Sequence, residues 1–357
     1  MENQKLYFAS DYQEGAHPAI LQRLLDTNLL KTPGYGTDAI CESARERIRK
    51  ACGTPSAAIH FVSGGTQANA AVIGAVLRPY QGVISADSGH VSVHEAGAIE
   101  AGGHKVLAIP SEEGKISAAG VALCLADYEQ DGNRDHMVMP GMVYLSHPNE
   151  FGVLYSLEEL EAISQVCREH HIPLFVDGAR LAYALACPEN DVTLADLGRL
   201  CDVFYIGGTK CGALLGEAIV LPNPDLIPHF FTIIKQDGAL LAKGRVLGIQ
   251  FDELLKDDLY LHIGESAITY ARQIKKALVD AGYELVFDSP TNQIFFIIDN
   301  GKMEKLGQYA VYNFGEKYDG SHSIIRFCTS WATTQEDTDK LCQVIKDRVT
   351  QSRQQNR

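Results

Sequence analysis

Lys210 and Asp177 each follow a short apolar run of the kind that forms a buried strand, at residues 203–206 and 173–176. A lysine amine can form a Schiff base with an aldehyde cofactor. A buried aspartate stays ionised when a cation such as a pyridinium nitrogen lies beside it. Taken singly, Asp177 also fits a turn or helix cap, and Lys210 a solvated loop lysine. Together they suggest pyridoxal 5'-phosphate, with Asp177 at the ring nitrogen and Lys210 as the amine.

A glycine turn, Ser63-Gly64-Gly65-Thr66, lies between a predicted strand and a predicted helix. Free N–H groups at a helix start bind phosphate, and the threonine hydroxyl adds a donor. The segment matches neither a Walker loop nor a dinucleotide fingerprint, and by itself it fits a simple turn with a threonine N-cap. In open α/β sheets, ligands bind outside the carboxyl ends of the strands. We therefore expect Gly64, Gly65 and Thr66 to hold the cofactor phosphate.

Two histidines and two arginines complete the candidate set. His90 follows a predicted strand, where an imidazole can stack on a planar ring or move a proton. His94 comes one helical turn later and allows a metal pair instead, but no third ligand of suitable spacing is evident, so no metal is expected. Arg180 and Arg326 are expected to hold a substrate carboxylate by bidentate pairing. A strand-edge ion pair is the alternative for Arg326.

The elements that must position these residues alternate between apolar runs and amphipathic stretches from about residue 57 to 221. Strands are predicted at 58–62, 82–86, 105–109, 142–146, 173–176, 203–206 and 217–221. Helices are predicted at 66–78, before Pro79, and at 157–171, where Ser156 and Glu159 form a capping box. Strands that are apolar throughout and linked by helices predict an α/β fold with a mostly parallel seven-stranded sheet.

The remaining sequence predicts a smaller α+β C-terminal domain. A helix is predicted at 262–281, strands at 284–287, 293–298 and 324–328, and a last helix from Thr334 to about residue 349. Residues 11–30, with Pro18 opening a helix, are expected to pack back onto this tail. The expected domains are an N-terminal segment packing on the small domain (1–32), a large cofactor-binding domain (33–245) and the small domain (246–357). Residues 351–357 are expected to form a frayed polar end.

The composition narrows the class of protein. The chain has 357 residues, 46% of them hydrophobic, and a formal net charge of −14, so its surface disfavours nucleic acid and anionic lipid. Nine scattered cysteines without a Cys-x-x-Cys pair fit reduced thiols. The N-terminus does not read as a signal peptide, and no run of about 18 apolar residues predicts a membrane span. We expect a cytoplasmic protein with no nucleic-acid or membrane partner.

In order along nearly the whole chain, these residues resemble the threonine aldolases, a branch of the fold-type-I pyridoxal-phosphate enzymes related to β-eliminating lyases. The most specific part is Asp177-Gly178-Ala179-Arg180 with the downstream Thr209-Lys210. The other shared segments are Ser10-Asp11, the Tyr35-Gly36 loop, residues 61–69, His90 with residues 95–98, and residues 326–329.

The resemblance implies a fold-type-I architecture and a role for each matching residue. Lys210 would carry the cofactor, Asp177 would pair with its ring nitrogen, and His90 would stack on the ring. Gly65 and Thr66 would bind the phosphate. Arg180 would contact the phenolic oxygen or the substrate carboxylate, and Ser10 and Arg326 that carboxylate. The implied assembly is a homotetramer or at least a homodimer, in which Lys235, Lys243 or Arg245 would act across an interface. Independently of the resemblance, the sequence allows Ser10-Asp11 and the glycine-rich loop at residues 33–36 to close over the site, although such a loop also fits a simple turn.

Two departures bear on the substrate. Pro148-Asn149-Glu150 stands where many members have Thr-His-Asn, and Thr329-Ser330 where they have Thr-His. His147 is a possible replacement for the first histidine, and the general base is open between His90 and Glu95. The favoured reaction is cleavage of a β-hydroxy-α-amino acid, such as threonine or allo-threonine, to glycine and an aldehyde. The alternatives are β-elimination or transamination on the same fold, and a non-catalytic partner, which the intact Asp177/Lys210 pair disfavours.

Overall fold

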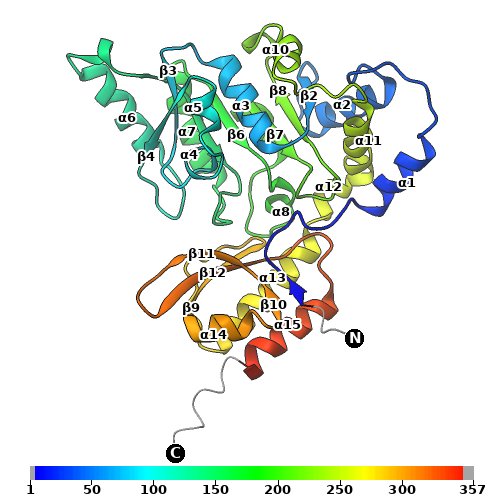
Figure 1. The fold of residues 1–357 in the computed structure, drawn as a ribbon. Helices are drawn as coiled ribbons and strands as arrows, with labels where there is room; N and C mark the ends of the chain where they lie inside the picture. Colours follow the sequence, from blue (N-terminus) through cyan, green and yellow to red (C-terminus); the bar gives the residue numbers. More distant parts are fainter. Residues whose placement is uncertain (1–4, 349–357) are drawn as a thin grey trace, which may run out of the picture.

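A seven-stranded sheet forms the centre of the computed structural model, which describes residues 5–348 (Figure 1). The sheet order is β2-β8-β7-β6-β5-β3-β4. Within it, β8 runs antiparallel to both neighbours and the other pairs are parallel, which confirms the predicted, mostly parallel sheet. The strands are β2 (Ala58–Val62), β3 (Gln81–Ala86), β4 (Lys105–Ile109), β5 (Met139–Ser146), β6 (Leu174–Asp177), β7 (Val203–Gly207) and β8 (Glu217–Leu221).

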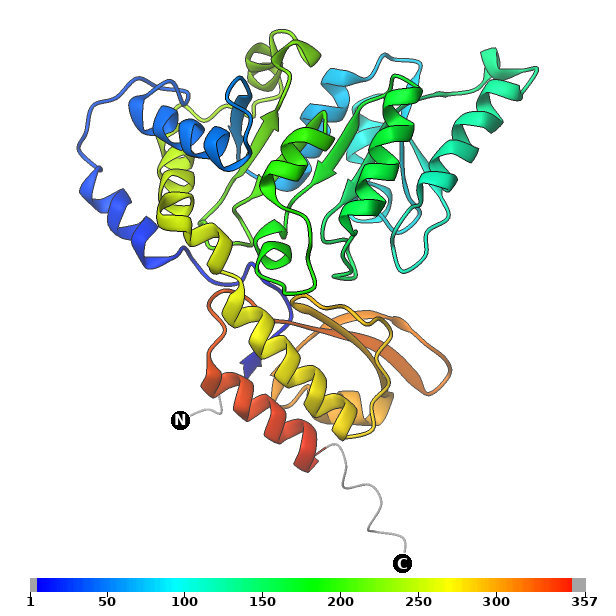
Figure 2. The same ribbon diagram turned by 180° about the vertical axis from the view of Figure 1, so that it is seen from behind.

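Helices cover both faces of this sheet, because successive strand residues point to opposite sides. On β6, Phe175 joins the buried cluster under α3 and α10, whereas Leu174 and Val176 join the cluster under α7 and α11. Figure 1 shows α3 on the near face, and Figure 2 shows helices over the opposite face. The helices are α2 (Ala39–Ala51), α3 (Gly65–Val76), α4 (His90–Val93), α5 (Ala98–Ala101), α6 (Ala118–Gln130), α7 (Leu157–Glu169), α8 (Leu181–Leu185), α9 (Leu194–Leu200), α10 (Phe230–Gln236) and α11 (Arg245–Leu254).

Local signals set the ends of two of these helices. The predicted capping box opens α7: Ser156 Oγ accepts the Glu159 N–H, and the Glu159 carboxylate accepts the Ser156 N–H. Helix α3 ends at Val76, two residues earlier than predicted, and Leu77 is already extended. Because the residue before a proline avoids helical geometry, Pro79 limits the helix from the C-terminal side.

The smaller unit is built on the antiparallel sheet β11-β12-β9, with α13 and α15 packed together. A two-stranded pair, β1 with β10, ties the N-terminus to this unit. The elements are β1 (Leu6–Tyr7), α12 (Leu259–His262), α13 (Glu265–Asp280), β9 (Gln293–Asp299), α14 (Asn300–Leu306), β10 (Ala310–Val311), β11 (Asn313–Lys317), β12 (His322–Cys328) and α15 (Gln335–Arg348). Short 3-10 turns occur at Arg134–His136, Pro224–Leu226 and Lys256–Asp258.

One prediction for this unit is wrong, and another is confirmed over a shorter range. Residues 284–287 form only a single bridge, Leu285 with Phe296, rather than a strand. Two backbone hydrogen bonds still join this segment to β9, and at its end Phe287 stacks on Phe151 of the large unit, with 4.2 Å between ring centroids. The helix predicted at 262–281 is confirmed as α13, which begins three residues later, after Gly264, whereas the separate short helix α12 ends at His262. The predicted end of the last helix and the frayed tail at 351–357 lie outside the described residues.

The N-terminal segment contacts both units. Leu6 and Tyr7 pair with β10, whereas α1 (Pro18–Asp26) packs against α11, which in turn packs against α2 of the large unit. The division of the chain at residues 32 and 245 stays a prediction. None of the helices within residues 5–348 is long and apolar enough to cross a membrane.

Candidate active site

Seven predicted residues meet in one cavity of about 250 Å³. They come from the carboxyl ends of β2, β3, β6 and β7 and from the segments that follow, as expected for a mostly parallel sheet. The seven are Gly64, Gly65, Thr66, His90, Asp177, Arg180 and Lys210.

One end of the cavity is the N-terminus of α3. Gly64 is extended and precedes the helix without a side-chain cap, so the first N–H groups of α3 have no capping side chain. A Cβ on Gly65 would lie 3.0 Å from the Tyr205 hydroxyl, and glycine therefore keeps the backbone close to that ring. Ser63 also lines the cavity, and its N–H and hydroxyl both donate to the Gln67 side-chain oxygen, at 3.0 and 2.9 Å. The arrangement fits a phosphate group.

Asp177 lies at the deep side of the cavity and is surrounded by hydrogen-bond donors. Its Oδ2 accepts the Tyr144 hydroxyl at 2.6 Å and the Asn69 amide at 3.1 Å. Burial acts to raise the pKa of Asp177, but His90 and the hydroxyls of Tyr144 and Tyr205 outweigh it and hold the pKa below its usual value. The ionised carboxylate fits a protonated ring nitrogen.

His90 belongs to the same network. Its Nδ1 lies 2.8 Å from Glu95 Oε1, which also accepts the Asn69 amide at 2.7 Å. The Glu95 side chain is fully buried and does not line the cavity, whereas His90 does. Glu95 therefore positions the His90 ring and cannot reach a ligand itself.

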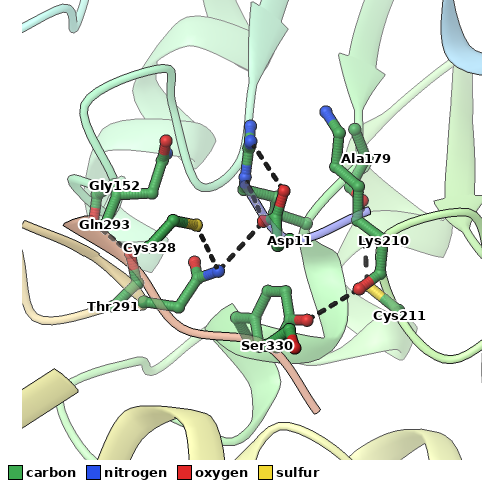
Figure 3. Close-up of polar contacts among 12 residues, drawn as sticks. Asp11, Gly152, Ala179, Lys210, Cys211, Thr291, Gln293, Cys328 and Ser330 are labelled. Carbon is green, nitrogen blue, oxygen red and sulfur yellow. Dashed lines mark hydrogen bonds and ion pairs between the residues drawn. The ribbon is translucent and has the colours of Figure 1, made fainter. Parts of the chain in front are cut away.

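Arg180 is bound by a carboxylate of the N-terminal segment. Its Nε and Nη2 donate to Asp11 Oδ2 and Oδ1 at 2.7 and 3.0 Å, and Asn292 donates to Asp11 Oδ2 at 2.9 Å (Figure 3). Burial acts to raise the pKa of Asp11, yet the charges of Arg180 and Lys210 lower it to about 2. The Lys210 carbonyl accepts the Tyr183 hydroxyl at 2.7 Å, and its side chain extends away from that contact (Figure 3).

A second cavity of about 590 Å³ opens between the two units. Phenylalanines from both units line it, as does Arg326 of β12. Arg326 donates to the Gln293 side-chain oxygen at 2.7 Å and to the Ala9 carbonyl at 3.0 Å. We call this second cavity the outer cavity and the first one, which contains Asp177 and Lys210, the inner cavity. The outer cavity offers an apolar wall with a guanidinium group, next to the inner cavity. Its phenylalanines are Phe151, Phe287, Phe295 and Phe314.

Several sequence candidates lie away from both cavities. Ser10 has a buried hydroxyl without a partner and lines neither cavity. His147 is fully buried, and its Nε2 lies 3.2 Å from the Asn190 side-chain oxygen. The Ser330 hydroxyl binds Glu14 at 3.0 Å. His147 therefore does not replace a histidine in this site.

Asn149 lines the inner cavity, but its amide holds a turn together. Its Oδ1 accepts the N–H groups of Phe151 and Val153, both at 3.0 Å, and its Nδ2 donates to the Glu113 carbonyl at 2.8 Å. The turn presents the next residue, Glu150, to both cavities.

The Tyr35-Gly36 loop and the basic residues Lys235 and Arg245 line neither of the two cavities. Tyr35 donates its N–H to the Ala242 carbonyl at 3.1 Å, and it lines neither cavity. Lys235 lies 4.1 Å from the centre of the Tyr35 ring. Arg245 binds the carbonyls of Leu30 and Asn28 at 2.6 and 2.9 Å.

Sequence reasoning assigned no role to several polar residues that line the inner cavity or bind Asp177. Glu217 is 3% exposed, and burial raises its pKa to about 7, although Gly208 donates its N–H to it at 2.9 Å. An acid that opens an otherwise apolar strand was the available signal. Asn69, within an apolar helix, was a similar one. Tyr144 and Tyr205 gave none, because aromatic residues are ordinary in buried strands.

No group of three or more histidines, cysteines, aspartates or glutamates in residues 5–348 is placed to hold a metal ion.

The sequence profile of the family described as β-eliminating lyase matches residues 8–301. A low specificity L-threonine aldolase of Pseudomonas aeruginosa is 32% identical and covers 95% of this chain and 96% of its own. The solved structure of Leishmania major threonine aldolase is 42% identical, with a TM-score of 0.93 over 96% of this chain and 99% of its own. An aspartate aminotransferase of Thermus thermophilus shares the fold, with a TM-score of 0.71 at 16% identity over 98% of this chain and 92% of its own.

Proposed function

Because the chain belongs to the β-eliminating lyase family, we propose that it is a pyridoxal-phosphate-dependent aldolase. The reaction is cleavage of a β-hydroxy-α-amino acid, threonine or allo-threonine among them, to glycine and an aldehyde. One observation carries the proposal: a single cavity joins a free helix N-terminus, an ionised aspartate and a lysine. The threonine aldolase relatives, similar over nearly their full length, support it.

The inner cavity fits pyridoxal phosphate at both of its ends. The cofactor supplies an electron sink for a bond broken at the substrate Cα. Gly64, Gly65 and Thr66 would hold the phosphate at the start of α3, and Asp177 would keep the ring nitrogen protonated. Lys210 would provide the amine, and the fixed His90 ring would cover one face of the cofactor.

The substrate carboxylate would lie between Arg180 and Arg326, which both line the outer cavity. Asp11 already occupies two nitrogens of Arg180, so this arginine would share its charge between Asp11 and the substrate. Arg326 has a buried Nε without a partner. Two guanidinium groups on opposite units can turn the substrate so that Cα–Cβ stands perpendicular to the cofactor ring. Ser10 would act only after a local rearrangement.

The decisive test of the cofactor site is Lys210→Ala. We expect the wild-type protein to be yellow, and the variant to lose the visible absorption band of the lysine-bound cofactor. Lys105→Ala, an exposed lysine on the edge strand β4, serves as the matched control and should keep the band. A band that survives in Lys210→Ala would overturn the lysine assignment.

Product analysis separates the reactions that this fold can support. An aldolase releases glycine and an aldehyde from threonine. The second candidate, β-elimination, is favoured by the family description and would release a keto acid and ammonia instead. Transamination would consume a keto acid acceptor. A panel of β-hydroxy amino acids, each assayed for glycine and aldehyde, also identifies the preferred side chain.

We propose further that the protein is a cytoplasmic homotetramer or at least a homodimer. Four leucines in and just after α1 are exposed, at 44%, 72%, 90% and 54%, which supports burial of this surface by another copy. All nine cysteines are free thiols, which supports a reducing compartment. The leucines are Leu21, Leu25, Leu29 and Leu30.

A further inference from the structure

The junction of the two cavities is where the reacting bond must lie. If the cofactor fills the inner cavity and the substrate side chain extends into the outer cavity, the Cβ and β-hydroxyl of the substrate lie between the two cavities. This step rests on the proposed function. Five residues line both cavities: Tyr12, His90, Glu150, Arg180 and Lys210.

Four of these five are unsuited to take a proton from the hydroxyl. Arg180 is a permanent cation already paired with Asp11, and Lys210 is assigned to the cofactor. Tyr12 offers a phenolic hydroxyl, which is a poor proton acceptor compared with a carboxylate. His90 is assigned to the ring face. Glu150 remains.

The hydrogen bonds of Glu150 leave one oxygen for a ligand. Its Oε1 accepts the Ser146 hydroxyl at 2.7 Å and the backbone N–H of His90 at 2.9 Å. Oε2 makes no hydrogen bond among residues 5–348. The main chain is also fixed, because the Glu150 carbonyl accepts the Gln293 amide at 3.1 Å. The carboxylate is therefore oriented before any substrate arrives.

We propose that Glu150 is the catalytic residue that accepts the proton of the substrate's β-hydroxyl, through Oε2. The hydroxyl proton moves to the carboxylate, and the O–H electron pair forms the C=O bond of the departing aldehyde. The Cα–Cβ bond breaks, and its electron pair stays with Cα. A proton delivered to Cα from solvent completes glycine, and Glu150 releases the hydroxyl proton to solvent.

The environment of Glu150 suits a base. Burial raises the pKa of Glu150, opposed by the Ser146 hydrogen bond, and the neighbouring charges are Asp177, which raises it, and His90, which lowers it. A general base is most effective when its pKa approaches the working pH. The rival bases are less well placed: Glu95 lines neither cavity, and His94 lines only the outer one.

The experiment compares two reactions of the holoenzyme carrying Glu150→Gln. Threonine cleavage needs a base at the β-hydroxyl, whereas exchange of the glycine Cα proton with deuterium oxide does not. We expect kcat for cleavage to fall about 100- to 10,000-fold, with glycine exchange within about threefold of wild type. The acidic limb of the kcat profile should also disappear. Glu113→Gln, an exposed acid on the loop that contacts the Asn149 turn, is the matched control and should leave both rates unchanged.

Two outcomes overturn the proposal. Cleavage that stays near the wild-type rate in Glu150→Gln means that another group takes the proton. An equal loss of cleavage and exchange means that Glu150 only shapes the site. If the Glu150→Gln protein does not retain the cofactor, the experiment is repeated with Glu150→Asp. In that variant the rate of threonine cleavage must fall more than the rate of glycine exchange. A wild-type protein that exchanges glycine yet releases none from any β-hydroxy amino acid refutes the aldolase function itself.

Discussion

Besides the charge of His90, neutral hydrogen-bond donors help Asp177 to keep its own charge. A tyrosine hydroxyl, an asparagine amide and the Ala179 N–H, at 2.9 Å, all point at its two oxygens. Such donors stabilise an ion without cancelling its charge, so the carboxylate can still act on a ring nitrogen. An asparagine at this position would have one acceptor oxygen instead of two, so it would keep only some of these hydrogen bonds and would carry no charge. The substitution therefore tests the role of the charge.

Asp177→Asn should therefore lower turnover sharply while preserving the fold. We expect kcat for glycine release to fall at least about 100-fold, since a fixed charge aimed at the reacting system is lost. Steady-state assays at saturating cofactor measure this. Turnover that persists in Asp177→Asn would contradict the pairing with a ring nitrogen, and Asp135→Asn, at an exposed turn, gives the baseline.

Glu217 links residue chemistry to stability. Burial raises the pKa of Glu217 from 4.5 to about 7. Between these two pH values Glu217 is ionised in the unfolded chain but still protonated in the folded protein. Stability conferred by the neutral acid is thus complete below about pH 4.5 and is lost as the pH rises towards 7. By pH 8 the free energy of unfolding is lower by about 3 kcal/mol because the buried carboxyl has ionised, using about 1.36 kcal/mol per pKa unit.

Glu217→Gln, which cannot ionise, should remove that cost. We expect the variant to gain up to about 3 kcal/mol of unfolding free energy over wild type at pH 8, and much less at pH 5. Urea unfolding of the cofactor-free protein at the two pH values measures the difference. A gain of equal size at both would refute the raised pKa.

At the scale of elements, the sheet could be predicted because its strands are buried on both faces. All seven predicted strands overlap observed ones, and β2, β4 and β8 have the predicted bounds. β11 was not predictable in this way, because all five of its residues are exposed and give no apolar pattern. Residues 284–287 are apolar enough for a strand, but they pair with β9 only through one bridge, and Phe287 packs on Phe151 of the large unit.

The site was predictable where chemistry follows directly from a strand end, as at Asp177 and Lys210. It was not predictable where a role depends on which strands are neighbours. Tyr144 on β5 reaches Asp177 only because β5 lies beside β6. Likewise, Arg180 meets Asp11 across 169 residues of sequence, a pairing that no local pattern encodes.

The turn that carries Glu150 is held by Gly152, which has a φ of +78°. A Cβ there would meet Ser289 Oγ and lie 2.5 Å from Thr291 Oγ1, both in the small unit. Gly152→Ala should destabilise the protein by about 1–3 kcal/mol, from the unfavourable φ and the overpacking. We also expect slower cleavage with the cofactor band retained.

Thermal unfolding and steady-state kinetics test this prediction. Gly132→Ala is the matched control, because a Cβ there meets nothing within 4 Å. If Gly152→Ala matches that control in both measurements, the turn does not depend on the close contact between the two units.

At the scale of the whole molecule, the N-terminal segment spans both units before the sheet begins. Its strand β1 joins the small unit, Asp11 enters the active site, and α1 covers α11. The outward side of α1 carries the exposed leucines. Nothing in the described chain covers these side chains, so they are the natural candidates for a contact between copies.

Leu25→Glu should therefore weaken the proposed assembly. We expect a lower molar mass by light scattering and a concentration-dependent loss of activity, because a charge would enter an apolar contact. Leu123→Glu on α6, at a leucine that is 62% exposed compared with 72% for Leu25, is the matched control. An unchanged mass for both variants would place any interface elsewhere.

Gln293 joins the two ends of the proposed substrate site through one amide. Its oxygen accepts Arg326 at 2.7 Å, and its nitrogen donates to the Glu150 carbonyl at 3.1 Å. The group that recognises the carboxylate and the peptide that carries the base are thus neighbours of the same side chain. A β-hydroxy amine that lacks the carboxylate should consequently lose kcat as well as affinity, because binding at a distant group is used to orient the reacting one.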